Sequence, residues 1–316
     1  MYLLGEVFSG DPAYVVPYQQ FMDGLLDYPC YYWITRAFQS PGGSISELVR
    51  GLSTLKDTAL DTSLYGSFLE NHDIERFASL TSDLSLAKNA IAFMMLKDGI
   101  PIIYQGQEQG FAGGPTPSNR EALWLSGYST FSDMYGWIAK LNQIRTWVAA
   151  QDPRHLVYRG FTVYSNSNTI VMRKGHTGYQ VISIYSNIGS RSTVTLTLPS
   201  SQTSFEPGQK LVDVLNCTFF TASSNGSITL ILSQGLPRVL YPMTRLSGSS
   251  MCPGLEVDVP STATATPTAT PTNISSSTGS STLPCSATTV PILFEVPAQT
   301  ALGDTIKLYV CPIVVF

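Results

Sequence analysis

The sequence lacks any long hydrophobic run. Apolar residues make up 43% of its 316 positions, yet no stretch approaches the roughly 20 consecutive apolar residues that a helix needs to cross a bilayer. We therefore expect no membrane partner. Charge is also scarce, because 18 Lys plus Arg against 22 Asp plus Glu give a net charge of −4. Nucleic-acid-binding domains carry strongly basic patches, so we do not expect nucleic acid as the main partner.

Cysteine patterns typical of metal sites are missing as well. The chain has five cysteines and three histidines but no Cys-X-X-Cys pair, which argues against a cysteine-ligated metal. An odd number of cysteines cannot pair completely. Cys217 and Cys252 are close enough in sequence to close a loop at the end of one domain, which the chain-entropy model values at roughly 3–4 kcal/mol. Two free buried thiols are the alternative.

The N-terminus does not show a signal peptide. A basic segment, an apolar stretch and a small-residue cleavage site do not follow one another there. Three Asn-X-Ser/Thr sequons nevertheless begin at Asn216, Asn225 and Asn273, and such sequons are typical of secreted glycoproteins. The composition therefore indicates a secreted protein, whereas the first residues do not.

Residues 1–152 alternate strand-like and helical segments. LLGEVF and YGSFLENHD read as strands, and Ile100–Tyr104 as a short buried strand. LAKNAIAFMMLKDG and SDMYGWIAKLNQIRTWV carry apolar residues at helical spacing, and Gly99 ends the first of these helices. Strands alternating with helices predict an α/β domain with a parallel sheet.

The pattern changes in the second half of the chain. Residues 153–246 form short β-branched segments separated by Gly, Asn or Ser, which predicts an antiparallel all-β domain. Residues 247–284 become rich in Ser, Thr, Ala and Pro and predict a disordered linker that cannot bury a core. Residues 285–316 begin a further β module that ends in an apolar tail.

Two carboxylates stand where strand-like segments end, Glu6 and Asp73. In an α/β barrel the carboxyl ends of the strands face the active site. Cleavage of a glycosidic bond needs one acid that protonates the leaving oxygen and a second carboxylate across the anomeric carbon. His72, beside Asp73, would donate a hydrogen bond to a sugar hydroxyl. A solvated surface acid at Glu6 and a helix-capping loop at Asp73 are the alternatives.

Longer segments identify a family. The chain resembles the C-terminal portion of secreted fungal α-amylases over about residues 2–246, in the segments GEVFSGDPAYVVPYQQFMDGLLDYP, GSFLENHDIERFAS, LAKNAIAFMMLKDGIPIIYQGQEQGFAGG and SNREALWLSGY. This resemblance implies the C-terminal half of a (β/α)₈ TIM barrel followed by an antiparallel β domain. It implies retaining endo-hydrolysis of α-1,4-glucosidic bonds, with starch and maltooligosaccharides as substrates, by a monomeric extracellular enzyme. Residues 285–311 resemble the start of a starch-binding domain.

The resemblance also assigns roles to single residues. Glu6 matches the general acid/base, and Asp73 matches the acid that stabilises the transition state. Gly10, His72 and Arg120 match substrate-binding positions.

Other family residues are missing. The family nucleophile lies in a motif resembling Gly-X-Arg-X-Asp on the preceding barrel strand, and this sequence has no such motif. The resemblance implies calcium, but the main calcium ligands fall outside this chain, which leaves Glu6 as a contributor to a secondary calcium site at most. We therefore expect a truncated and weakly active or inactive α-amylase. A transglycosylase of the same clan and a non-catalytic secreted glucan-binding protein remain as alternatives.

Overall fold

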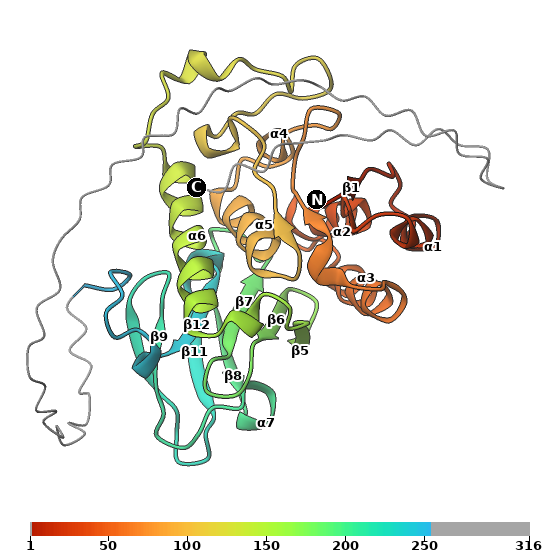
Figure 1. Ribbon diagram of the computed structural model, residues 1–316. Coiled ribbons are helices and arrows are strands. Elements are labelled where there is room, and N and C mark those ends of the chain that lie inside the picture. The colour runs from red at the N-terminus through yellow and green to blue at the C-terminus, as the bar shows by residue number, and fades with distance from the viewer. Residues whose placement is uncertain (1, 254–316) are drawn as a thin grey trace, which may run out of the picture.

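The structure is a computed structural model that describes residues 2–253. An α/β part lies above an antiparallel β part in the view of Figure 1. Residues 254–284 of the predicted linker and the predicted module at 285–316 lie outside the described residues. None of the described helices is long and apolar enough to span a membrane.

The elements follow one another in the order that the sequence predicts, with strands and helices in the first part and mainly strands in the second, where α7 is a single turn. The helices are α1 (Pro12–Val15), α2 (Tyr28–Phe38), α3 (Ile45–Thr58), α4 (Phe77–Leu80), α5 (Leu84–Leu96), α6 (Asp133–Gln151) and α7 (Ser200–Thr203). The strands of the first part are β1 (Leu4–Gly5), β2 (Gly24–Leu25), β3 (Gly66–Ser67) and β4 (Ile100–Pro101). Those of the second are β5 (Phe161–Ser165), β6 (Thr169–Lys174), β7 (Val181–Ser186), β8 (Val194–Leu198), β9 (Lys210–Asp213), β10 (Thr218–Thr221), β11 (Ile228–Leu232) and β12 (Arg238–Pro242).

The four strands of the first part are parallel and neighbour one another in chain order. β1 pairs with β2 and β3 with β4, and a single parallel bridge from Leu26 to Gly66 joins the two pairs. This arrangement agrees with the predicted α/β class. The strands are shorter than the sequence indicates, with two residues each. The predicted strand Ile100–Tyr104 is shortened to β4, in which Pro101 has no N–H to give to a ladder.

The two predicted helices are present and begin at side-chain caps. Asp83 accepts a hydrogen bond from the Ser85 N–H at the start of α5, and Ser132 accepts one from the Tyr135 N–H at the start of α6. Gly99 ends the turn after α5 with φ +108°, and a Cβ there would lie 2.6 Å from the Tyr65 carbonyl oxygen. Only glycine fits this close approach, so α5 leads into β4 without steric conflict.

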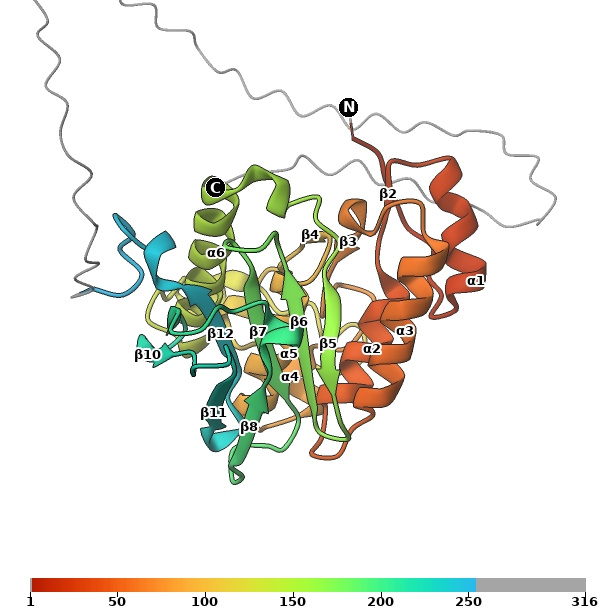
Figure 2. The ribbon, with the colours of Figure 1, turned by 90° about the horizontal axis from the view of Figure 1, so that it is seen from below.

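The antiparallel part contains a six-stranded sheet in the order β10-β9-β12-β7-β6-β5 and a separate pair of β8 and β11. Figure 2 shows β12, β7, β6 and β5 side by side in this order. Both faces of the sheet are covered. Along β7, Val181 and Tyr185 join the core shared with the helices, while Ile182 and Ile184 join a second core beneath β8 and β11. The alternation of side chains along a strand therefore serves two cores.

The two parts are packed tightly against each other. The ring of Phe93 on α5 lies 5.1 Å from that of Tyr185 on β7. The buried Asn187 amide donates hydrogen bonds to the carbonyl oxygens of Ala37 (2.9 Å) and Gly43 (2.7 Å) around the end of α2. The helices thus hold the antiparallel sheet by apolar packing and by hydrogen bonds from its loops.

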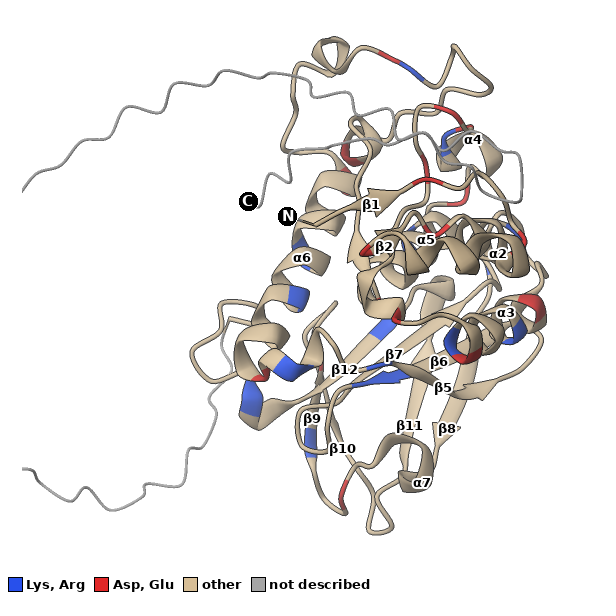
Figure 3. Ribbon diagram, turned by 45° about the vertical axis from the view of Figure 1, so that its right-hand side comes forward, with Lys and Arg blue, Asp and Glu red and all other residues tan. Residues whose placement is uncertain are grey.

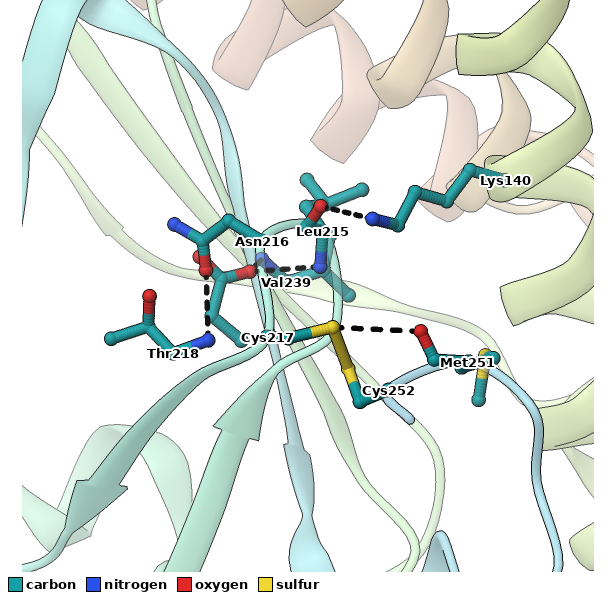
Figure 4. The surroundings of a disulfide bond; sticks show 9 residues. Lys140, Leu215, Asn216, Cys217, Thr218, Val239, Met251 and Cys252 are labelled. Atoms are coloured by element: carbon teal, nitrogen blue, oxygen red, sulfur yellow. Dashed lines mark hydrogen bonds between the residues drawn. A yellow bond between two sulfur atoms is a disulfide. The ribbon is translucent and has the colours of Figure 1, made fainter. Parts of the chain in front are cut away.

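A disulfide joins Cys217 to Cys252, which leaves Cys30 as a free, buried cysteine among the described residues. Figure 4 shows the bond at the turn before β10. Met251 and Cys252 are buried, although the sequence analysis assigned residues from 247 onward to a disordered linker. The disulfide and the apolar contacts of Met251 hold these two residues on the β domain, so the prediction of a linker that buries no core is wrong for Met251 and Cys252.

Candidate active site

The two predicted catalytic carboxylates follow β1 and β3, which lie on either side of β2 in the parallel sheet. Glu6 comes directly after β1 and is half-buried. Asp73 lies in the loop after β3, with 35% of its side chain exposed. Both strands are parallel, so the two residues leave the sheet at its carboxyl edge, where the active sites of such sheets form.

A chain of hydrogen bonds connects the Glu6 carboxylate to the backbone of Asp73. The Tyr28 hydroxyl at the start of α2 donates to Oε1 of Glu6 at 2.8 Å. The Asn71 amide nitrogen donates to the Tyr28 hydroxyl at 2.9 Å, and its Oδ1 accepts the backbone N–H of Asp73 at 2.8 Å. Two side chains therefore connect the predicted acid to the predicted transition-state stabiliser. The burial of Tyr28 and its bond to Glu6 raise the pKa of Tyr28, so its hydroxyl remains a donor.

An arginine and a histidine side chain flank the second carboxylate. Arg120 Nη2 lies 3.3 Å from Oδ1 of Asp73, and His72 Nε2 lies 3.4 Å from its Oδ2. Arg120 Nε also donates to the backbone oxygen of His72 at 2.9 Å. His72 and Arg120 are about half exposed and are accessible to a ligand. The structure thus brings together three of the residues that the sequence analysis selected.

A buried ion network that sequence reasoning missed fixes the ends of this loop. Arg76, whose side chain is fully buried, lies 3.0 Å from Glu70 and 2.8 Å from Glu121, and it donates to the Gln105 carbonyl oxygen at 2.8 Å. Its guanidinium lies 4.2 Å from the centre of the Tyr104 ring. Figure 3 shows acidic segments around a basic segment beside α4. Glu70 and Arg76 flank the loop that carries His72 and Asp73, so the network holds the loop at both ends.

Glu70 is unusual within that network. Burial raises its pKa to about 7, although the hydrogen bonds from Arg76 and from the Phe77 N–H oppose this shift. Asn119, which is also fully buried, donates to the Ile74 carbonyl oxygen at 2.7 Å and connects the loop to the segment that carries Arg120. The only sequence signal was a Glu and an Arg among apolar neighbours, and the partner Glu121 is 45 positions from Arg76.

Gly10 lies apart from these groups, against Tyr32. A Cβ at this position would meet the Tyr32 ring at 2.7 Å, so no larger residue fits without movement. An open hollow of about 550 Å³ adjoins it, lined by Phe8, Ser9, Gly10, Asp11, Tyr32 and Arg36. No contact within the described residues joins Gly10 to Asp73 or Arg120, and its role remains a prediction.

The described residues do not fit a calcium site by themselves. Calcium takes six to eight oxygen ligands, most of them carboxylates and carbonyls. Within residues 2–253 no group of three or more His, Cys, Asp or Glu side chains is placed to hold a metal ion. Glu6, the predicted secondary ligand, instead accepts a hydrogen bond from Tyr28. We therefore derive no catalytic step through a metal from this chain.

Comparisons with known proteins agree with this arrangement. Residues 1–158 match the family described as alpha amylase, catalytic domain, and residues 162–260 match alpha-amylase, domain C. Alpha-amylase 1 of Schwanniomyces occidentalis is 47% identical over 252 residues, which cover 80% of this chain and 49% of the relative. Alpha-amylase 1 of Lipomyces kononenkoae is 53% identical over 252 residues, covering 80% and 40%.

Solved structures give the same result. The structure of an alpha-amylase from Malbranchea cinnamomea aligns with a TM-score of 0.76 at 43% identity and covers 80% of this chain and 53% of that one. The chain spans about half the length of the curated relatives it matches. The sequence motifs, the α/β part with its strand-end carboxylates and the antiparallel β domain lead to one conclusion: this chain belongs to the α-amylase family.

Proposed function

We propose that the chain supplies two of the three catalytic carboxylates of an α-amylase that hydrolyses α-1,4-glucosidic bonds in starch and maltooligosaccharides with retention. The observation that carries this proposal is the hydrogen-bonded chain from Glu6 through Tyr28 and Asn71 to Asp73. It links the Glu6 carboxylate to the backbone of Asp73 at the carboxyl edge of a parallel sheet, and His72 and Arg120, which can bind sugar hydroxyls, lie beside the Asp73 carboxylate.

Each residue has a defined task in this proposal. Glu6 protonates the glycosidic oxygen as the bond breaks and later takes a proton from water, in the manner of retaining glycosidases. Tyr28 fixes the orientation of that carboxyl group through its hydroxyl. Asp73 binds the sugar whose ring gains positive charge in the transition state. His72 and Arg120 hold the Asp73 carboxylate in position for this task.

The third carboxylate, the nucleophile, is proposed to come from residues outside the printed sequence, because no segment of this chain matches the family's Gly-X-Arg-X-Asp motif. The same holds for the calcium ligands of the family. The half-barrel architecture and an extracellular location rest on the resemblance to fungal relatives and are part of this proposal.

A reducing-sugar assay tests the proposal. The expressed chain is compared with a version extended at its N-terminus by the upstream half of the Schwanniomyces occidentalis relative. We expect starch hydrolysis by the extended protein and activity on the order of 10⁴–10⁶-fold lower in the chain alone, because a covalent mechanism without its nucleophile loses about this much. Equal activity of the two proteins would contradict the account of the missing nucleophile.

Single substitutions in the extended protein test the assigned roles. Glu6→Gln should lower kcat by about 10²–10⁴-fold, which is the usual contribution of a general acid. Glu206→Gln, an exposed acid in the β domain, is the matched control and should leave kcat unchanged. An unchanged kcat in the Glu6→Gln protein would remove Glu6 from the mechanism.

Transfer instead of hydrolysis would appear in the same assay. Maltooligosaccharide products longer than the substrate would support the transglycosylase alternative. Binding of starch without release of reducing ends by the extended protein would support the non-catalytic alternative.

A further inference from the structure

Strand β10 is an edge strand whose own residues carry no charge and no proline. Among residues 2–253 it lies at one end of the six-stranded sheet and pairs on one side only, with β9. Natural edge strands avoid pairing with other molecules by means of short length, charged side chains, prolines, bulges or a covering segment. Residues 214–237 contain no Asp, Glu, Lys, Arg or His, and β10 itself reads TFFT. Phe219 in its middle is 54% exposed.

An uncharged apolar edge of this kind favours aggregation. Segments of six or seven residues with high β-propensity, no charge and no proline pair readily in cross-β fashion, and Cys217–Ala222 has this composition. The disulfide at Cys217 fixes the start of the strand but leaves its outer edge open within the described residues. The four-residue length of β10 and the Lys210 ammonium group, which donates to the Thr221 hydroxyl at 3.1 Å, protect this edge in part, and a bulky group at either end of the strand would add to that protection.

Two sequons stand at the two ends of this strand. Asn216 precedes β10 by two residues, with Thr218 as its hydroxyl residue, and Asn225 follows β10 by four residues, with Ser227. Both asparagines are exposed. The middle residue of the second sequon, Gly226, has φ +76°.

The two asparagine side chains are held in the same way. Oδ1 of Asn216 accepts the Thr218 N–H at 3.1 Å, and Oδ1 of Asn225 accepts the Ser227 N–H at 3.0 Å. Among the described residues, the amide nitrogen of neither asparagine donates a hydrogen bond. Figure 4 shows the Asn216 side chain pointing away from α6 and from the disulfide. Both nitrogens are therefore free to carry a substituent without loss of a protein contact.

We propose that Asn216 and Asn225 each carry an N-linked oligosaccharide, and that the two glycans cover the open edge of β10. The glycans take the place of the charged residues that this segment lacks. The inference concerns the β domain alone and does not depend on the catalytic role of Glu6 or Asp73.

The modification is a group transfer from a polyprenyl-diphosphate-linked oligosaccharide, catalysed by a membrane-bound transferase of the secretory pathway. The bond between the asparagine nitrogen and C1 of the first sugar forms, and the bond between C1 and the diphosphate oxygen breaks. The amide nitrogen loses one proton, and the diphosphate leaving group takes it up. No oxidant or reductant is involved.

Peptide mass spectrometry tests occupancy. The full chain is secreted from a yeast host behind a supplied leader, with Asn273→Gln introduced to remove the third sequon. Peptide-N-glycosidase in ¹⁸O-labelled water leaves labelled aspartate where a glycan was attached, which distinguishes it from spontaneous deamidation of Asn225 before Gly226 during sample preparation. We expect labelled aspartate at both Asn216 and Asn225. Unmodified asparagine at either position overturns the proposal that both ends of β10 are covered.

The protective role needs a second measurement, made on folded protein. Purified glycoprotein is deglycosylated under native conditions, and light scattering is followed beside the untreated sample. We expect a several-fold faster rise after deglycosylation. Phe219→Lys, which places a charge on the bare edge, should abolish this difference. Equal rates in the treated and untreated protein, or no effect of Phe219→Lys, would overturn the role assigned to the glycans.

Discussion

Substitution of the buried Arg76 by methionine gives the sharpest test of the loop architecture. Arg76→Met keeps a long apolar side chain but removes the ion pairs to Glu70 and Glu121, the bond to the Gln105 carbonyl oxygen and the contact with the Tyr104 ring. Removal of one partner of a buried ion pair typically costs about 3–5 kcal/mol. We expect a loss of stability at the lower end of this range, about 3 kcal/mol at pH 7, because the buried Glu70 carboxyl group that loses its partner can take up a proton.

The pH dependence follows from the pKa of Glu70, which burial raises from 4.5 to about 7. A carboxyl group whose pKa is higher in the folded than in the unfolded state stabilises the folded state while it is protonated. This stabilisation is complete below the unfolded-state pKa and is lost as the pH rises through the folded-state pKa. Arg76 lowers the pKa of Glu70, so its removal moves that loss to higher pH. The cost of Arg76→Met should stay constant up to about pH 7 and then grow by about 1.4 kcal/mol per pH unit.

Urea unfolding of the full chain, followed by circular dichroism at several pH values from about 6 to 9, measures this cost. Arg36→Met is the matched control, because the Arg36–Glu47 pair is largely exposed, with side-chain exposures of 42% and 28%. Such surface pairs contribute about 0–1 kcal/mol. If Arg76→Met costs no more than Arg36→Met, or if its cost falls above pH 7, the reasoning about the buried network is refuted.

Three further substitutions test other parts of the molecule. Tyr28→Phe removes the hydroxyl that orients Glu6, and in the extended protein it should lower kcat on the order of tenfold, about 1.4 kcal/mol of barrier, with the fold intact by circular dichroism. The double change Cys217→Ser and Cys252→Ser removes the disulfide that joins residues 35 positions apart, and it should lower the free energy of unfolding by about 3–4 kcal/mol. The reference is the oxidised wild-type protein, and wild type treated with a reductant should lose about the same amount. Asn187→Ala removes the hydrogen bond to the buried Ala37 carbonyl oxygen and one of the two that the Gly43 carbonyl oxygen accepts, since the Ile45 N–H still donates to the latter. It should cost about 1–3 kcal/mol in the same urea assay, and a cost below about 0.5 kcal/mol would contradict its role between the two parts.

The sequence predicted those features whose causes lie within a few residues. Helix α5 was predictable because apolar residues recur at helical spacing and Gly99 follows its end. The antiparallel part was predictable from β-branched segments between turn residues. The position of Glu6 directly after β1 was predictable from where an apolar segment stops, whereas Asp73 lies in a loop well beyond the end of β3, which is shorter than its apolar segment indicated.

Features that depend on distant residues were not predictable. The pairing of Arg76 with Glu121 spans 45 positions, and nothing in the local sequence indicates which acid will meet the guanidinium. The burial of both faces of β7 was not predictable either. All six of its residues are buried, and only the structure shows that alternate side chains enter two separate cores.

The sequence by itself determined the order of the elements, the family and the residue types of the candidate site, because hydrophobic periodicity and short motifs are local properties. The tertiary structure decided which side chains meet. Tyr28 comes to lie between Glu6 and Asn71 only because parallel strands bring segments 22 and 43 positions apart to one edge of the sheet. The same holds for the open edge of β10, since a strand becomes an edge only through the order in which the chain assembles its sheet.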